Sequence, residues 1–87
     1  MTLLQLKYVI TIADCGSMNE AAKRLYLSQP SLSETVMSLE EEVGIEIFIR
    51  TNRGIKTTVE GEEFLAYARQ VVEQYRLLDD KYISLSL

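Results

Sequence analysis

The sequence predicts a mainly α-helical domain of three helices and a two-stranded β-hairpin, followed by one long helix. Apolar residues recur at helical spacings of three and four through most of the chain. In residues 45–57, by contrast, isoleucines alternate with other residues on the way into a turn, which is typical of a β-hairpin. The 87 residues, 47% of them hydrophobic, can form one small domain with a modest core. We place this domain at 1–58 and the long helix at 59–87.

Two helices are expected before residue 28. Residues 2–13 carry a broad apolar stripe, which predicts a helix buried on one side that braces the following helices from behind. Ser17 and Glu20 have the spacing of a capping box, and the alanines at 21–22 form a narrow face on which another helix can pack closely. The connection that follows, residues 26–27, is very short.

A third helix is expected to begin near Gln29. Ser28 is a good N-cap, Pro30 suits the first turn, and Gly44 supplies the stop. One side of this helix is apolar and would be buried, and it consists of Leu32, Val36, Leu39 and Val43. The opposite side is polar in its first half and carries Pro30, Ser31, Glu34, Ser38 and Glu41, with Ser33 on its flank and Gln29 at the exposed tip.

These two adjacent helices match a helix-turn-helix at about 18–37. In that motif the second helix enters the major groove of DNA, and small polar side chains allow its backbone to approach closely. An ordinary helical hairpin fits the composition and periodicity equally well.

The alternating segment predicts a β-hairpin, or wing, at about 45–57. Isoleucines alternate with other residues up to Arg50, a turn follows at 51–54, and a second strand ends at 57. A wing beside a helix-turn-helix can place its tip over the adjacent minor groove, where negative potential attracts arginine. Arg53 is the side chain that we expect there.

The long helix carries a heptad pattern. Thr58 is its candidate N-cap, and acidic residues follow in the first turns. Apolar residues then step by four and three, and they are Phe64, Ala68, Val71, Tyr75, Leu78, Tyr82 and Leu85. A helix of about 28 residues is about 40 Å long and outreaches so small a domain. We therefore expect homodimerisation through this helix rather than packing on its own domain.

The composition argues against several classes of function. One cysteine and no histidine leave no plausible metal or haem site and no default general base, so we expect no cofactor and no enzymatic activity. Cys15 is expected to be a passive small residue. No signal-peptide pattern or membrane-length apolar run is present, which predicts a cytoplasmic, nucleoid-associated protein without a membrane partner.

The net charge of −4 is the main objection to DNA binding. Residues 1–58 hold six basic and seven acidic side chains. Arg50, Arg53 and Lys56 nevertheless form a basic stretch without acids, and screening limits each charge to about 8–10 Å at physiological salt. We expect weak non-specific affinity, and we expect the acidic run at 40–42 to be a solvated face.

Many short segments, spaced along the chain from Leu3 to about Gly61, together carry a resemblance to one family. They are Gln5-Leu6-Lys7-Tyr8, Gly16-Ser17-Met18, Ala21-Ala22-Lys23-Arg24-Leu25, Ser28-Gln29-Pro30-Ser31-Leu32-Ser33, Leu39-Glu40, Gly44, Phe48-Ile49-Arg50, Arg53-Gly54, and Thr58 with Gly61. In this combination the chain resembles the N-terminal DNA-binding domain and linker helix of LysR-type transcriptional regulators.

The resemblance implies a winged helix-turn-helix that dimerises through the linker helix and reads an interrupted palindrome in a promoter. It also implies a C-terminal domain that binds a small-molecule effector, and we expect that domain to be absent from these 87 residues. The main alternative is a protein-interaction module with little DNA affinity.

The resemblance further implies which residues meet double-stranded DNA. Family positions that match the start of the third helix touch bases or phosphates, as does the one matching Arg53, while the one matching Arg50 braces the wing. The residues that we expect at the DNA interface are Ser17, Ser28, Gln29, Pro30, Ser31, Ser33, Glu34, Ser38, Arg50 and Arg53.

Glu34 departs from the arginine or lysine that is common in the family at this position. A carboxylate on the groove-facing side repels phosphates but can accept a hydrogen bond from cytosine N4. That Glu34 faces solvent or pairs with an arginine is an equally open alternative.

Overall fold

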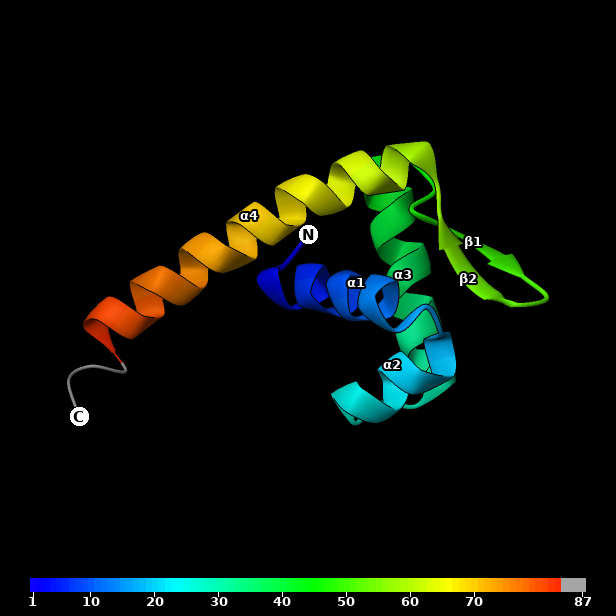
Figure 1. Cartoon of the computed structure of the whole chain (residues 1–87), viewed down its shortest axis with the longest axis horizontal. Helices are drawn as coiled ribbons and strands as arrows, with labels where there is room; N and C mark the ends of the chain where they lie inside the picture. The colour runs from blue at the N-terminus through cyan, green and yellow to red at the C-terminus, as the bar shows by residue number, and fades with distance from the viewer. Residues whose placement is uncertain (84–87) are drawn as a thin grey trace.

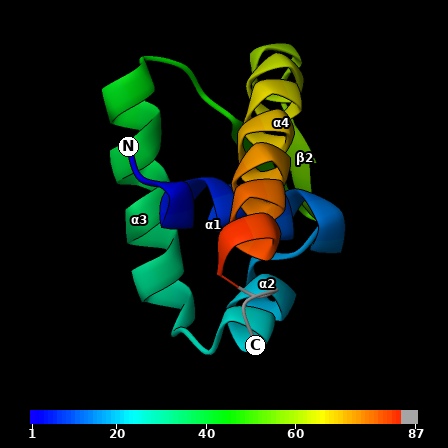
Figure 2. The same ribbon diagram turned by 90° about the vertical axis from the view of Figure 1, so that its left-hand side faces the viewer.

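The computed structural model describes residues 1–83. In chain order the elements are α1 (Leu3–Cys15), α2 (Met18–Leu25), α3 (Gln29–Val43), β1 (Phe48–Thr51), β2 (Gly54–Thr57) and α4 (Val59–Tyr82). The hairpin projects from one side of the group formed by α1, α2 and α3, while α4 extends away on the other side (Figure 1). α1 contacts α2, α3 and α4, and Figure 2 shows α3 standing apart from the rod of α4. The predicted winged helix-turn-helix with a long following helix is confirmed.

Side-chain caps fix the starts of the helices. The hydroxyl oxygens of Ser17, Ser28 and Thr58 each accept a hydrogen bond from the backbone N–H three residues later, at 3.2, 3.2 and 2.8 Å. Thr2 and Gln5 form a reciprocal capping box at the start of α1. The predicted starts of α2, α3 and α4 are therefore confirmed.

The hydrophobic core lies between α1, α2 and α3 and extends to the base of the wing and the start of α4. The small side chains of Ala21 and Ala22 are buried, which lets α2 pack closely on its neighbours. Cys15 is half-buried beside this core. The buried members of the core are Val9, Ile12, Met18, Ala21, Ala22, Leu32, Val36, Leu39, Ile47, Phe48 and Leu65.

The hairpin is shorter than the sequence predicts. β1 begins at Phe48, so residues 45–47 lie outside the strand, and Ile47 and Phe48 are both buried instead of alternating. The carboxylate of Glu40 explains the difference, because it accepts hydrogen bonds from the N–H groups of Ile47 at 2.7 Å and of Phe48 at 3.2 Å. The predicted turn at 51–54 and the return strand to 57 are confirmed.

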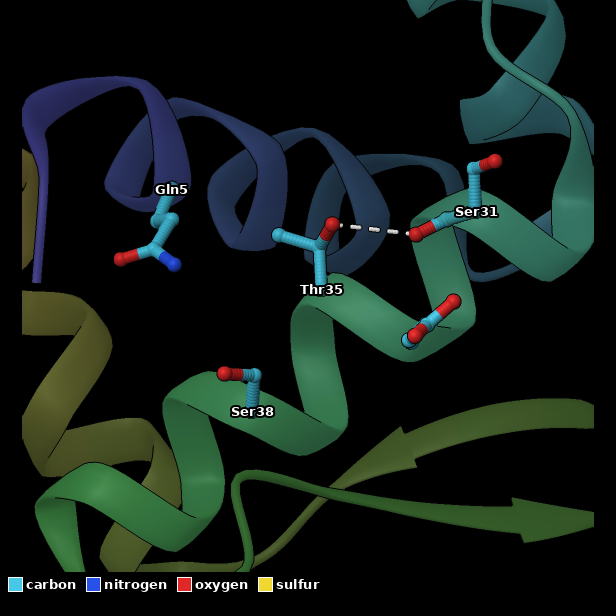
Figure 3. A pocket seen from close by; sticks show the side chains of 5 residues that line it. Gln5, Ser31, Thr35 and Ser38 are labelled. Atoms are coloured by element: carbon cyan, nitrogen blue, oxygen red, sulfur yellow. Dashed lines mark hydrogen bonds between the residues drawn. The ribbon is translucent and has the colours of Figure 1, made fainter.

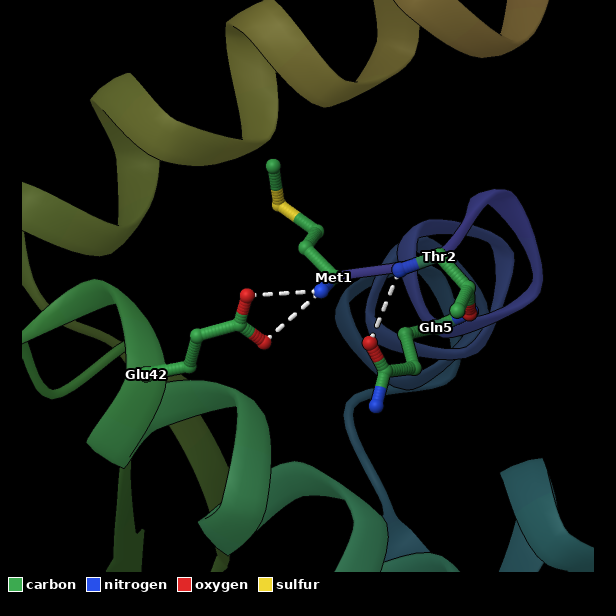
Figure 4. Close-up of polar contacts among 4 residues, drawn as sticks. All are labelled: Met1, Thr2, Gln5 and Glu42. Carbon is green, nitrogen blue, oxygen red and sulfur yellow. Dashed lines mark hydrogen bonds and ion pairs between the residues drawn. The ribbon is translucent and has the colours of Figure 1, made fainter.

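The expectation that residues 40–42 form a solvated acidic face is wrong for Glu40. Its side chain is half-buried and holds the connection that leads from α3 into the wing. Glu41 and Glu42 are exposed, and Glu42 accepts hydrogen bonds from the Met1 amino group at 2.6 and 2.8 Å (Figure 4). One of the three acids is therefore structural.

The first half of α4 is attached to the domain. The Thr58 N–H donates to the Ile47 carbonyl at 3.0 Å, and a Cβ atom at Gly61 would lie 2.2 Å from the same oxygen. Further along, Ala68 is 3% exposed and the Arg69 guanidinium pairs with Asp14 of α1 at 2.7 Å. This half of the helix lies on its own domain, which the sequence analysis did not expect.

Candidate nucleic-acid interface

The outward side of α3 is the centre of the candidate site. Its residues are exposed because Leu32, Val36 and Leu39 turn the opposite side of the helix into the core. At the start of the helix, the Ser28 hydroxyl donates to the Ser31 hydroxyl at 2.8 Å and accepts from the Ser31 N–H at 3.2 Å. The exposed outward residues are Pro30, Ser31, Glu34, Met37, Ser38 and Glu41, and Gln29 and Ser33 are half-buried at its flank.

An open polar hollow of about 390 Å³ lies between the start of α1 and the outward side of α3. Its lining comprises Gln5, Ser31, Glu34, Thr35 and Ser38 (Figure 3). The Thr35 hydroxyl donates to the Ser31 carbonyl at 3.0 Å, so it is already engaged with the helix backbone. No local sequence pattern predicts Gln5 at this site, because its place beside α3 depends on how α1 packs.

Arg50 joins the wing to α3. Its guanidinium donates a hydrogen bond to the hydroxyl of Ser33. A second hollow, of about 210 Å³, brings Ser17 at the start of α2 and Gln29 at the start of α3 together with Arg50 on β1. Four of the predicted residues, contributed by three elements, therefore lie in one region.

Arg53 lies at the exposed tip of the wing. The antiparallel register closes the hairpin with Thr51 opposite Gly54, which leaves Asn52 and Arg53 in the loop. The Thr51 hydroxyl accepts from the Arg53 N–H at 3.3 Å and donates to the Gly54 carbonyl at 3.1 Å, so one side chain orders the turn. Lys56 is exposed on β2.

The base of this loop is fixed to the turn between α1 and α2. The Ile55 N–H donates to the Gly16 carbonyl at 3.3 Å. Gly54 has φ +124°, and a Cβ atom there would lie 2.8 Å from the same carbonyl oxygen, so the site admits only glycine without movement. This attachment sets the position of Arg53 relative to the helix-turn-helix.

One side of α4 is apolar and largely exposed, although the Lys7 ammonium group of α1 lies over the Tyr75 ring, 5.6 Å from its centroid. We define the α4 seam as Phe64, Tyr67, Val71, Tyr75, Leu78 and Tyr82. Phe64 is half-buried against the core, and the other five are 48–65% exposed. Ala68, which we expected in this stripe, faces the domain instead, and Leu85 lies outside the described residues. Tyr67 lies outside the predicted heptad pattern and is an additional exposed member of the α4 seam.

Ion pairs among the described residues lie mostly away from the wing. On α4, Arg76 pairs with Glu73 and with Asp80, both at 2.7 Å. The hydrogen bond from Arg76 lowers the pKa of Glu73, and the same bond raises the pKa of Arg76. The contribution of this pair to folding is therefore present above the unfolded pKa of Glu73 and is lost as the pH falls through the lowered value.

The cations of the wing are differently placed. Within residues 1–83, no carboxylate lies within 4.0 Å of the charged groups of Arg50, Arg53 or Lys56. These charges are therefore not neutralised locally, although the molecule as a whole is acidic.

Two features are absent from the described part of the chain, a metal site and a membrane span. No group of three or more acidic, cysteine or histidine side chains is arranged to hold a metal ion. No helix is both long and apolar enough to span a bilayer.

Comparison with known proteins identifies the family. The model of a family described as bacterial regulatory helix-turn-helix protein, lysR family, matches residues 3–62. The regulator TfdT of Cupriavidus pinatubonensis is 40% identical over 72 residues, which are 83% of this chain and 32% of that protein. The regulator TcbR of Pseudomonas sp. strain P51 is 42% identical over 73 residues, which are 84% of this chain and 25% of that protein.

A solved structure agrees with these relatives. The crystal structure of the CbnR DBD–DNA complex superposes with a TM-score of 0.89 at 37% identity and covers 100% of both chains. The chain spans about a quarter to a third of the length of the two curated relatives, whose names are those of transcriptional regulators and not of enzymes. The chain belongs to the lysR family of bacterial regulatory helix-turn-helix proteins.

Proposed function

We propose that this domain binds double-stranded DNA as a homodimer and directs a transcriptional regulator to an interrupted palindromic promoter site. The observation that carries the proposal is the meeting of Ser17, Gln29, Ser33 and Arg50 in one region beside an exposed arginine loop. A polar helix start suits the major groove of DNA, and a cationic wing beside it suits the adjacent minor groove. The CbnR domain with the same fold is solved as a DNA complex.

The elements have different roles in this proposal. α3 enters the major groove with its outward side, where Gln29, Pro30 and Ser33 meet base edges or nearby phosphates. The hydroxyls of Ser17, Ser31 and Ser38 are short donors suited to phosphate oxygens, which position the domain without reading sequence. The Ser28 hydroxyl donates to Ser31 and so orients that side chain at the start of the helix. The tip of the wing carries Arg53 toward the minor groove, and Arg50 braces the wing against α3.

The α4 seam supports the dimer. Five large apolar side chains at least 48% exposed on one side of a helix form a continuous patch that a second copy can cover. Two seams packed side by side, in the antiparallel arrangement usual for similar proteins, would carry two recognition helices at a fixed separation. A two-fold DNA site follows from that two-fold protein symmetry.

A protein-interaction module is the second candidate function. The exposed α4 seam could bind a different partner, and the net charge of −4 weakens attraction to DNA. The two functions differ in one measurable property, which is discrimination between DNA sequences.

The test is selection of binding sites from a random duplex pool. The winning duplex and a scrambled duplex are then titrated at two salt concentrations. We expect a two-fold interrupted palindrome, bound about a thousandfold more tightly than the scrambled control. A folded dimer in sedimentation that enriches no sequence would overturn DNA recognition and favour the interaction module.

A further inference from the structure

Glu34 occupies a central place on the outward side of α3. It lies five residues after Gln29, about 7.5 Å along the helix axis, which is comparable to the depth of the major groove. Pro30 and Ser31, its exposed neighbours toward the helix start, are both shorter. Glu34 therefore has the longest side chain among the exposed outward residues of the first two turns.

The surroundings of Glu34 offer it no cation. No ion pair joins Glu34 to any arginine or lysine within residues 1–83, whereas Asp14, Glu42, Glu73 and Asp80 all have one. The hollow beside it is lined otherwise by neutral groups of Gln5, Ser31, Thr35 and Ser38. Within residues 1–83, Glu34 therefore does not pair with an arginine, which was one of the alternatives left open. Both of its carboxylate oxygens can accept hydrogen bonds from another molecule.

The edges of the four bases differ in what they offer such a carboxylate. Guanine presents only acceptors in the major groove and thymine presents an acceptor and a methyl group, so both are rejected. Adenine presents the N6 donor beside the N7 acceptor, which repels a second carboxylate oxygen. Cytosine presents the N4 donor without an adjacent ring acceptor. An ionised carboxylate therefore favours cytosine.

On the basis of the DNA-binding function proposed above, we infer that Glu34 is a specificity-determining residue that accepts a hydrogen bond from the N4 amino group of one cytosine in each half-site. Its charge is also repelled by the acceptor atoms that guanine, thymine and adenine present at the same place in the groove. Sequence discrimination then comes both from the bond with the correct base and from repulsion with every other base.

The experiment is site selection with three versions of the 87-residue chain: wild type, Glu34→Gln and Glu41→Gln. Glu41 is the matched control because it is an exposed glutamate of α3 about two turns further on, beyond the residues of this helix that are expected at the DNA interface. We expect one fixed cytosine in each half-site for wild type and for Glu41→Gln. For Glu34→Gln we expect adenine there, because an amide pairs with adenine N6 and N7 together.

Titration supplies a second readout. Replacing the selected C·G pair by T·A is expected to weaken wild-type binding at least about fivefold and to weaken Glu34→Gln binding less than about twofold. The same fixed cytosine selected by Glu34→Gln, or equal losses in both proteins, overturns the inference and leaves the proposed function standing. A wild-type protein that binds no duplex at all overturns both.

Discussion

One backbone oxygen determines how α4 joins the domain. The Ile47 carbonyl accepts the N–H of Thr58, and Gly61 lies against the same atom on the first turn of the helix. No side chain fits between the two segments at this point. The close approach of the first turn of α4 to the segment before β1 therefore depends on a single glycine.

We expect Gly61→Ala to lower the free energy of unfolding by about 1–3 kcal/mol, because the added Cβ atom would lie 2.2 Å from the carbonyl oxygen. Elsewhere in a helix the same change raises stability by up to about 1 kcal/mol, so the sign is diagnostic. Urea unfolding followed by circular dichroism measures the difference. Glu62→Ala, at the exposed next position, should change stability by less than about 0.5 kcal/mol.

We expect Arg53→Ala to weaken binding of the selected duplex about tenfold, because it removes the cation at the tip of the wing. Fluorescence anisotropy titration measures the change. Asn52→Ala, at the other position of the same loop, is the matched control and should leave affinity nearly unaltered. Equal affinities for wild type and Arg53→Ala would contradict the placement of the wing in the minor groove.

At the level of elements, local signals predicted the helices well and the wing less well. The caps at Ser17, Ser28 and Thr58 act within three residues, so the sequence alone reveals them. The late start of β1 depends on Glu40, which lies seven residues before Ile47 and reaches it only in the folded chain. The alternating pattern of the sequence does not predict that contact.

The candidate site divides in the same way. The polar outward side of α3 follows from helical periodicity, and the exposed loop of the wing follows from its turn residues. The hydrogen bond between Arg50 and Ser33 and the position of Gln5 beside α3 arise from packing between elements. The burial of Ala68 has the same origin, because the heptad pattern does not reveal that α1 covers this part of α4.

The α4 seam leads to a prediction about assembly. We expect Leu78→Asp to abolish the dimer, because it places a charge in the apolar stripe, and to weaken DNA binding through loss of bivalency. Leu77→Asp is the matched control, since Leu77 is similarly exposed, 46% against 58%, but points away from the seam. Sedimentation equilibrium distinguishes monomer from dimer. Dimers of Leu78→Asp, or monomers of both variants, would contradict an interface at the seam.

Across the whole molecule, charge is divided unevenly between two ends. Residues 59–87 hold three basic and six acidic side chains, whereas the three cations at 50, 53 and 56 have no acid among them in the sequence. At physiological salt these groups act over about 8 Å, so DNA at the wing experiences mainly the local cations. The net negative charge of the whole chain therefore does not determine whether the domain binds DNA.

The small number of cations predicts a shallow salt dependence. For a dimer, the slope of log affinity against log salt concentration is expected to be less steep than about −8, because each protomer contacts few phosphates. Titration of the selected duplex at several salt concentrations gives this slope. A steeper value would mean that more phosphates are neutralised than the cations near the wing and the start of α3 can account for.

The attachment of the wing to Gly16 positions the wing through backbone atoms, whereas side chains on α3 and at the wing tip would contact the bases. The contact consists of one backbone hydrogen bond and one close approach between glycines, with no side chain involved. In a DNA-binding domain, substitutions at the wing tip, or on α3 away from the hydrogen bond between Ser33 and Arg50, can therefore change the preferred bases while the distance between the two contact regions stays the same. Substitution of surface side chains alone can therefore change the base sequence that the domain prefers in a half-site. A change in the spacing between half-sites instead requires a change in the backbone or in the pairing of α4.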